Sequence, residues 1–154
     1  MTKQELRRQI RDEIKRLSAA ERDTQSLFIC LQILGTAEWQ EAQTVMLYEA
    51  LPDEVSLQLL IDDARGSGKE IIIPDQSANA PVIPEEVLSQ IDFALIPGRA
   101  FTRQGKRLGR GGGWYDRTLP HLHCPKWAVA FGCQIKKDVP TDSWDVRMDR
   151  VVTA

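Results

Sequence analysis

Short apolar runs that alternate with segments of helical periodicity constrain the fold of this chain more than any other feature. The apolar runs lie at residues 45–48, 71–73, 93–96, 127–131 and 151–152. Apolar runs this short predict buried strands. A helix expected over about residues 54–65, followed by a turn at 66–68, separates the first two runs and makes a β-α-β unit. The alternation as a whole predicts an α/β sandwich built on a mostly parallel sheet.

Two amphipathic helices are expected before the first strand. Apolar residues recur at helical spacing over residues 3–17. The segment from Ser18 to Glu21 has the pattern of a capping box and predicts a second helix, which Gly35 can end. Farther along, a polar, Pro-containing loop is expected over 75–84, one or two helical turns over 85–90, and a helical turn over 115–119.

Length and composition predict one globular domain spanning residues 1–154. The chain is 42% apolar and 27% charged, which is ordinary for a soluble protein. The sequence contains no apolar run long enough for a membrane span and no signal-peptide pattern, so we expect a cytoplasmic location. The three cysteines, Cys30, Cys124 and Cys133, form no Cys-x-x-Cys pair, and we expect reduced thiols.

Residues 105–117, with the sequence GKRLGRGGGWYDR, carry the strongest chemical signal. This stretch contains five glycines, four cations and a single carboxylate, Asp116. Glycines let backbone N–H groups turn towards an anion, Lys and Arg neutralise its charge, and a lone Asp can hold an accompanying Mg²⁺. The segment follows the strand expected at 93–96, and ligands bind at the carboxyl ends of parallel strands. It therefore favours a nucleotide-using enzyme.

Other interpretations of the same segment remain open on the residues alone. Neither the P-loop motif nor the dinucleotide fingerprint is present, since Trp114 stands where that fingerprint has Gly. A solvated surface turn or an RGG-type RNA contact would also tolerate these residues. The net charge of the chain is −2, yet residues 99–117 carry six cations against Asp116 alone. A compact basic patch on an acidic protein fits a small polyanion, such as ATP or a polyglutamylated ligand, better than a long nucleic acid.

The spacing of these residues resembles the signature of the 5-formyltetrahydrofolate cyclo-ligase (5,10-methenyltetrahydrofolate synthetase) family. The resemblance centres on Leu95-Ile96-Pro97-Gly98 and on residues 105–117. Further matching positions in the same order are Lys3, Leu6, Arg7, Tyr48, Glu54, Lys69, Pro74, Gln134, Pro140 and residues 145–153. The match spans nearly the whole chain. It implies a three-layer α/β/α sandwich on a mostly parallel sheet, of the NagB/RpiA/CoA-transferase-like kind.

The resemblance also implies an activity. Members of that family convert 5-formyltetrahydrofolate to 5,10-methenyltetrahydrofolate with ATP and Mg²⁺, through phosphorylation of the formyl oxygen and cyclisation by N10. We accordingly expect a small-molecule folate substrate, which can be polyglutamylated, and a monomeric protein with no membrane or nucleic-acid partner.

Carrying the family's roles over by position gives a set of expected site residues. Those expected at the nucleotide are Lys3, Arg7, Arg107, Leu108, Gly109, Arg110, Gly111, Gly112, Gly113, Trp114 and Tyr115. Asp116 and Asp149 are expected to hold Mg²⁺. Glu54, Arg110 and Tyr115 are expected at the folate, with Arg110 and Tyr115 bordering the transferred phosphate as catalytic residues. Without the resemblance, Lys3 and Arg7 would be the solvated face of a helix.

Two alternatives concern particular segments. Trp114 can either stack on a ligand ring or pack in the core. The sequence His121-x-His123-Cys124 is a weak candidate for a transition-metal site, because it lacks a fourth ligand.

One interval is shorter than is usual in the family. Only residues 75–90 fill the stretch between the strand that ends at Pro74 and the strand before Pro97, where an additional strand would line the folate site. A compact cyclo-ligase, an ATP-dependent enzyme with an altered substrate, and a nucleotide- or folate-binding homologue without turnover therefore all remain open. An RNA-binding relative is a weaker alternative.

Overall fold

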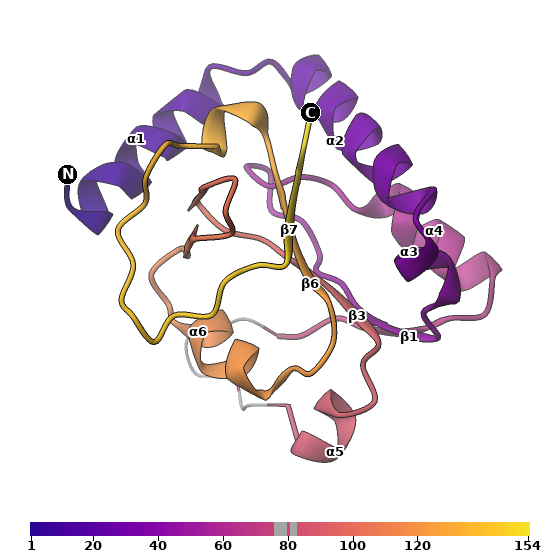
Figure 1. Cartoon of the computed structure of the whole chain (residues 1–154). Helices are drawn as coiled ribbons and strands as arrows, with labels where there is room; N and C mark the ends of the chain where they lie inside the picture. The colour runs from indigo at the N-terminus through magenta and orange to yellow at the C-terminus, as the bar shows by residue number, and fades with distance from the viewer. Residues whose placement is uncertain (76–79, 81–82) are drawn as a thin grey trace.

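A computed structural model describes residues 1–75, 80 and 83–154 of the chain. Five strands form one fully parallel sheet in the order β2-β1-β3-β6-β7 (Figure 1). Their bounds are Thr44–Met46 for β1, Glu70–Ile72 for β2, Phe93–Ile96 for β3, Lys126–Ala130 for β6 and Arg150–Thr153 for β7. All five coincide with the apolar runs within two residues at each end. The predicted parallel α/β sheet is confirmed.

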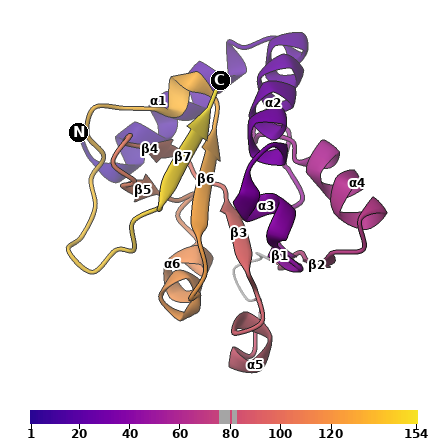
Figure 2. The same ribbon diagram turned by 45° about the vertical axis from the view of Figure 1, so that its right-hand side comes forward.

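The two faces of the sheet pack against different helices. Side chains alternate along a strand, so Val45 and Leu95 belong to one buried cluster while Met46 and Ile96 belong to another. The first face is covered by α1 (Lys3–Lys15), α2 (Ala19–Leu34), α3 (Ala37–Glu41) and α4 (Gln58–Gly66). The second is covered by α5 (Glu85–Leu88), α6 (Trp114–Thr118) and the 3₁₀ turn η1 (Leu119–His121). Figure 2 shows α2, α3 and α4 on one side of the strands and α6 on the other, which confirms the three layers.

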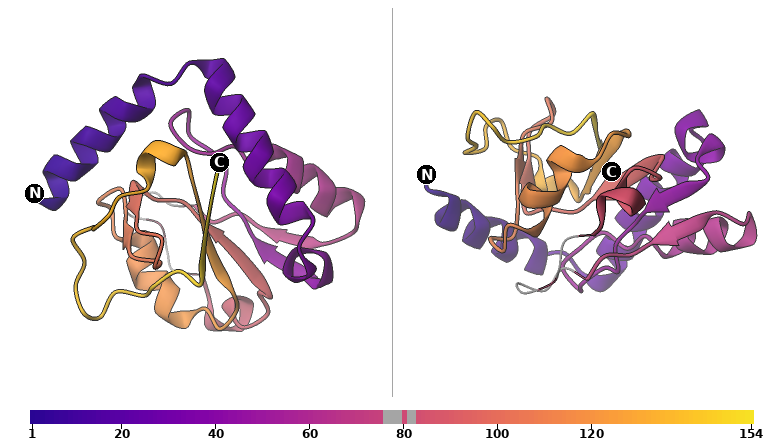
Figure 3. Two further views of the ribbon diagram at one scale, coloured as in Figure 1. Left: turned by 45° about the horizontal axis from the view of Figure 1, so that its top comes forward. Right: turned by 90° about the horizontal axis from the view of Figure 1, so that it is seen from below.

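Local capping explains where the first two helices begin. Thr2 and Ser18 each accept a hydrogen bond from a backbone N–H three residues on, and Glu5 and Glu21 return the bond, which completes two capping boxes. Gly35 caps the end of α2, as predicted, and α1 ends two residues earlier than expected. The two helices meet at an angle (Figure 3).

Some elements differ from expectation. Helix α4 begins four residues later than the predicted residue 54, because tertiary hydrogen bonds hold the preceding residues in a non-helical conformation. Ser56 N–H donates to the Ser26 hydroxyl, and the Tyr48 hydroxyl donates to Val55 C=O. The elements that the periodicity did not predict are α3, the antiparallel hairpin of β4 (Ala100–Phe101) and β5 (Arg107–Leu108), and the 3₁₀ turns η1 and η2 (Gly132–Gln134). Most of the loop expected at 75–84 lies outside the described residues.

The strand order creates a switch point between β1 and β3. The chain leaves β1 to form β2 on one side, then returns to form β3 on the other. Ligands of open α/β sheets bind outside the carboxyl ends of the strands at such a point. The hairpin β4–β5 follows β3 and brings residues 105–117 to this place (Figure 2). Within the described residues, no helix has the length and apolar character needed to cross a membrane.

Candidate active site

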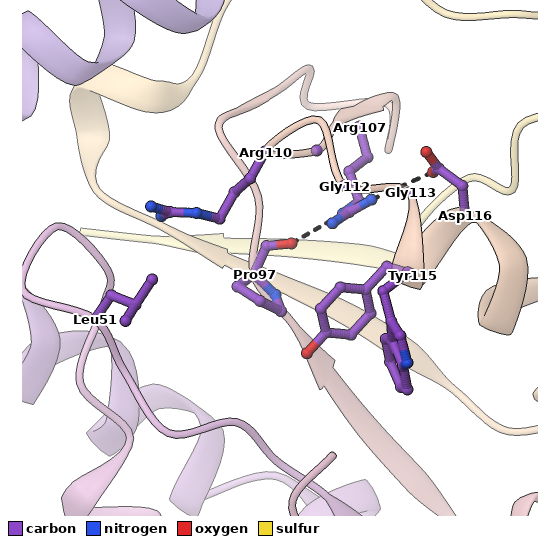
Figure 4. A pocket seen from close by; sticks show the side chains of 10 residues that line it. Leu51, Pro97, Arg107, Arg110, Gly112, Gly113, Tyr115 and Asp116 are labelled. Carbon is purple, nitrogen blue, oxygen red and sulfur yellow. Dashed lines mark hydrogen bonds and ion pairs between the residues drawn. The ribbon is translucent and has the colours of Figure 1, made fainter. Parts of the chain in front are cut away.

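A pocket opens at the carboxyl ends of β1 and β3, between the turn after β1 and the Gly-rich loop (Figure 4). It is lined by Leu51, Pro97, Arg107, Gly109, Arg110, Gly112, Gly113, Trp114, Tyr115 and Asp116. Seven of these lining residues belong to the set expected from the sequence at a nucleotide, and Asp116 was expected at its metal ion. The structure therefore gathers much of the predicted site around one hollow.

The buried guanidinium of Arg107 anchors this pocket. Its side chain is only 5% exposed, its Nε donates to Pro97 C=O at 2.9 Å, and one Nη lies 3.4 Å from a carboxylate oxygen of Asp116 (Figure 4). The Tyr115 ring lies 5.1 Å from its Cζ atom. Burial lowers the pKa of Arg107, and the negative charge of Asp116 counteracts this effect. A fixed cation with one partly exposed carboxylate beside it can attract an additional anion.

The glycines let the loop run close to this cation. A Cβ atom at Gly109 would lie 3.1 Å from an Nη of Arg107, and the neighbouring Gly113 has φ of 78° where α6 begins. That backbone conformation is one that L side chains rarely adopt. The loop between β5 and α6 can therefore present backbone groups to the pocket next to the guanidinium.

Helix α1 reaches the same loop from the other end of the chain. Arg7 Nε donates to Gly109 C=O at 2.8 Å, and Lys3 Nζ lies 3.3 Å from Asp142. The structure thus brings Arg7 directly to the glycines. Lys3 instead contacts the segment 141–147, which borders a second hollow next to Arg107.

Buried polar atoms that make no hydrogen bond occur in the wall of the pocket and next to it. Within the described part of the chain, Glu54 Oε2, Tyr115 Oη and Trp114 Nε1 are buried and make no hydrogen bond. Leaving such a group unpaired costs about 1–3 kcal/mol, so these atoms are candidates for ligand contact. Burial raises the pKa of Glu54 and that of the Tyr115 hydroxyl.

The aromatic pair of this region packs mainly inward. Trp114 is 5% exposed, belongs to the second core cluster, and lies edge-on to Tyr115 at 4.9 Å between ring centres. Of the two roles considered for Trp114, the structure favours core packing, with one edge at the pocket.

Asp53 is a site residue that no sequence pattern indicated. Its two oxygens accept hydrogen bonds from Arg99 at 2.6 Å and from Arg110 at 3.0 Å. Burial alone would raise the pKa of Asp53, but these two hydrogen bonds outweigh it and hold the pKa below its ordinary value. Asp53 therefore orients Arg110 over the pocket, with Arg110 also 3.6 Å from Glu54 Oε2.

The structure separates the two carboxylates that we expected to share a magnesium ion. Asp149 precedes β7 and accepts a hydrogen bond at 2.8 Å from the N–H of Lys126, the first residue of β6, so it lies at the amino ends of the strands. Asp116 lies beside Arg107 at the carboxyl ends. Asp145, four residues before Asp149, instead lines the hollow that Arg107 also lines.

The alternative metal site is not supported. Among the described residues, no group of three or more His, Cys, Asp or Glu side chains is arranged to hold a metal ion, and His121 instead lies 3.5 Å from Glu85. The cysteines are free thiols, as expected.

Comparison with known proteins decides the family. The model of the 5-formyltetrahydrofolate cyclo-ligase family matches residues 1–82 and 76–154, which together span the chain. The chain belongs to this family. It is therefore an enzyme of the ligase class, in agreement with the sequence signature.

Relatives support the assignment over the full length. A 5-formyltetrahydrofolate cyclo-ligase of Mus musculus is 28% identical over 187 aligned positions, covering 97% of this chain and 92% of that protein. A solved 5,10-methenyltetrahydrofolate synthetase from Mycoplasma pneumoniae superposes with a TM-score of 0.84 at 27% identity, covering 99% of both chains. The synthetase of Aquifex aeolicus gives a TM-score of 0.82 at 28% identity, over 99% of this chain and 89% of that one.

These coverages bear on the short interval at residues 75–90. The alignment with the mouse cyclo-ligase is longer than the 154 residues of this chain, so it contains gaps. The Mycoplasma pneumoniae synthetase is covered over 99% of its chain with a TM-score of 0.84. The short interval therefore does not prevent this chain from spanning the fold of a structurally characterised synthetase.

Proposed function

We propose that this enzyme converts 5-formyltetrahydrofolate to 5,10-methenyltetrahydrofolate with consumption of ATP in the presence of Mg²⁺. The observation that carries the proposal is the closeness of two features: a buried carboxylate oxygen of Glu54 that makes no hydrogen bond and lies 3.6 Å from Arg110, and the pocket that Arg110, Arg107 and the Gly-rich loop line. The first can accept hydrogen bonds from the N–H edge of a pterin, and the second can bind phosphate.

The phosphate-binding part consists of the loop 107–113 and α1. Arg107 supplies a fixed positive charge, and Arg7 approaches the loop through Gly109. Lys3 contributes from the first turn of the helix. Arg and Lys side chains and backbone N–H groups are the usual partners of phosphate oxygens.

The residues also fit a magnesium ion. Mg²⁺ is usually held by one or two carboxylates together with phosphate oxygens and water. Asp116, 3.4 Å from Arg107, and Asp145, in the hollow that Arg107 also lines, can supply these carboxylates. We assign Asp116 and Asp145 as these groups, in place of the pair Asp116 and Asp149. A bound Mg²⁺ would offset the negative charge of the phosphates during transfer.

The chemistry requires activation of a poor leaving group. Transfer of the γ-phosphoryl group of ATP to the formyl oxygen makes the formyl carbon electrophilic, N10 attacks it, and inorganic phosphate leaves with the former formyl oxygen. Arg110, held by Asp53, is placed to stabilise charge on the transferred group. Burial raises the pKa of the Tyr115 hydroxyl, so Tyr115 keeps its proton and can donate a hydrogen bond to an oxygen of the transferred phosphoryl group.

Product formation tests this proposal directly. Purified protein is mixed with 5-formyltetrahydrofolate, ATP and Mg²⁺, and the near-ultraviolet absorbance of the methenyl product is followed. A rise that requires all three components is expected. Binding of folate and ATP by calorimetry with no rise in absorbance would instead favour a sensor, and binding of ATP alone would favour a different substrate.

A further inference from the structure

Trp144 differs from the other tryptophans of the chain in its exposure. It is 77% exposed, whereas each of the other three is 5% exposed or less. Trp144 lies in a tight turn, in which Asp145 N–H donates to Asp142 C=O at 3.1 Å and Asp142 N–H donates to a carboxylate oxygen of Asp145 at 2.8 Å. Turns usually carry small or polar residues, and tryptophan is mostly buried in folded proteins. Packing within the fold therefore does not explain an aromatic side chain at this position.

The turn belongs to the wall of the hollow beside Arg107. We call this hollow the mixed hollow, because cations and carboxylates both line it. Its lining residues are Lys106, Arg107, Thr141, Asp142, Ser143, Asp145, Val146 and Arg147. Trp144 is the one residue of the range 141–147 that does not line it, although both of its chain neighbours do, so Trp144 lies at the rim. Arg107 lines both the mixed hollow and the pocket that contains Tyr115, so the two adjoin.

The lining of the mixed hollow suits the phosphates and the metal ion of a nucleotide but not its base. Lys106, Arg107 and Arg147 can bind phosphate oxygens, and the carboxylates can hold Mg²⁺. Among the described residues that line the hollow, Val146 is the one apolar residue and none is aromatic. Aromatic side chains bind bases by stacking, because every base has a π-face. The aromatic ring that the hollow lacks is therefore present at its rim, on Trp144.

The segment that carries Trp144 is fixed at its ends and weakly held in its middle. Val139 and Met148 are buried, and Met148 N–H donates to Gly105 C=O at 2.8 Å. Between them, Asp142 forms an ion pair of 3.3 Å with Lys3 of α1, in which both side chains are more than 40% exposed. Such surface pairs add little stability, and Lys3 is itself proposed to bind phosphate. The turn can therefore shift towards a bound nucleotide while its ends stay in place.

We propose that Trp144 stacks on the base of the nucleotide whose phosphates bind in the mixed hollow. This inference rests on the proposed function and adds to it the residue that binds the base. The transferred phosphoryl group then lies on the side of Arg107 that faces Tyr115, and the base lies at the far end of the nucleotide, beside the turn. Because stacking requires only a π-face, phenylalanine can replace Trp144 in this role and alanine cannot.

The kinetic experiment compares ATP with inorganic tripolyphosphate, which has the phosphates but no base. In Trp144→Ala we expect the KM for ATP to rise about tenfold, with kcat unchanged because the contact is the same in the ground state and the transition state. In Trp144→Phe the KM should stay within about twofold of the parent. The inhibition constant of tripolyphosphate should be the same in all three proteins. Phe28→Ala, which removes a 54% exposed aromatic side chain from α2, is the matched control and should keep the KM of the parent.

Fluorescence gives a measurement that does not depend on turnover. Acrylamide quenches exposed tryptophan, so in the parent it reports mainly on Trp144. Saturating ATP with Mg²⁺ should reduce this quenching, because a stacked base covers the indole ring. Tripolyphosphate with Mg²⁺ should leave the quenching unchanged. In Trp144→Phe the part of the quenching that ATP reduces should be lost.

The outcomes separate this inference from the proposed function. An unchanged KM for ATP in Trp144→Ala, an equal rise in the inhibition constant of tripolyphosphate, or an equal rise in the KM of Phe28→Ala would overturn the inference. Quenching of the parent that ATP does not reduce would also overturn it. If no methenyl product forms, the proposed function fails and the quenching experiment tests the inference alone. Protection of Trp144 by ATP but not by tripolyphosphate would then uphold it, and absence of protection would refute it.

Discussion

One Nη atom of Arg110 lies 3.6 Å from Glu54 Oε2, while Asp53 accepts a hydrogen bond from the same Nη atom at 3.0 Å. The adjacent carboxylates of Asp53 and Glu54, on the turn after β1, thus share one cation but differ in how many hydrogen bonds they accept. Asp53 is fully engaged by two arginines, whereas one oxygen of Glu54 has no hydrogen bond within the described chain. The turn therefore holds Arg110 in place with one residue and leaves the next available to a ligand.

Replacing the carboxylate of Glu54 should raise the stability of the protein while weakening folate binding. Burial raises the pKa of Glu54 above its ordinary value of 4.5, so ionising the folded protein costs stability. Glu54→Gln removes that cost, and the variant should be more stable than the parent at about pH 7. Below about pH 4 the parent is protonated in both folded and unfolded states, so the difference should close as the pH falls.

The same variant should bind folate more weakly, because an amide offers one acceptor where a carboxylate offers two. We expect its KM for folate to rise at least about tenfold. Urea unfolding at both pH values and steady-state kinetics measure the two effects. If Glu54→Gln were less stable than the parent at about pH 7, burial of the ionised Glu54 carboxylate would not be destabilising.

A pair of single substitutions can decide between Asp145 and Asp149 as the second magnesium ligand. Asp145→Asn should reduce kcat at least about a hundredfold and raise the Mg²⁺ concentration needed for half-maximal rate, because it removes one proposed metal ligand. Asp149→Asn, four residues away at the other end of the strands, should keep the Mg²⁺ requirement of the parent. A loss of Mg²⁺ affinity confined to Asp149→Asn would restore the assignment expected from the sequence.

Asp116, the other proposed metal ligand, provides a second test of the same site. Asp116 is 57% exposed and makes one long contact at 3.4 Å, so Asp116→Ala should leave the unfolding midpoint nearly unchanged. Turnover with Mg²⁺ and ATP should be abolished. Thermal unfolding and the absorbance assay together check this, and full activity in the variant would remove Asp116 from the metal site.

The contrast between Asp145 and Asp149 shows what could and could not be predicted from the sequence. Strand positions and the cap at Ser18 depend on neighbouring residues, and they were predicted correctly. The directions of the two aspartate side chains before β7 depend instead on their contacts. Asp145 accepts a hydrogen bond from Asp142 N–H in a local turn, whereas Asp149 accepts one from the distant Lys126 N–H. Two aspartates four residues apart therefore look equivalent in the sequence but face opposite ends of the sheet.

The role of Asp53 was unpredictable for a similar reason. Its two partners, Arg99 and Arg110, lie 46 and 57 residues later in the chain. Arg110 was expected at the site from the resemblance, but nothing in the local pattern around residue 53 indicates which carboxylate would orient it.

Arg107 should contribute more to ATP binding than to folate binding. Arg107→Ala removes the buried cation beside the glycines, and the KM for ATP should rise at least about tenfold, with a smaller change for folate. Some stability should also be lost, because the Pro97 carbonyl loses its donor. Arg103→Ala, an exposed cation on the same hairpin, is the control and should behave like the parent. Equal losses for both substrates would show that Arg107 maintains the whole pocket instead of the nucleotide part.

The close approach between the loop and this cation can be tested with a single methyl group. In Gly109→Ala the new Cβ would lie 3.1 Å from one Nη and 3.3 Å from the other Nη of Arg107, so the guanidinium must shift although Pro97 and Asp116 hold it. In Gly112→Ala the new Cβ meets no atom within 4 Å. We expect the KM for ATP to rise about tenfold in Gly109→Ala and by a smaller factor in Gly112→Ala, with both proteins folded by circular dichroism. A larger effect in Gly112→Ala would contradict this expectation. It would show that the nucleotide requires open space next to Gly112, and that the packing of Gly109 against Arg107 matters less.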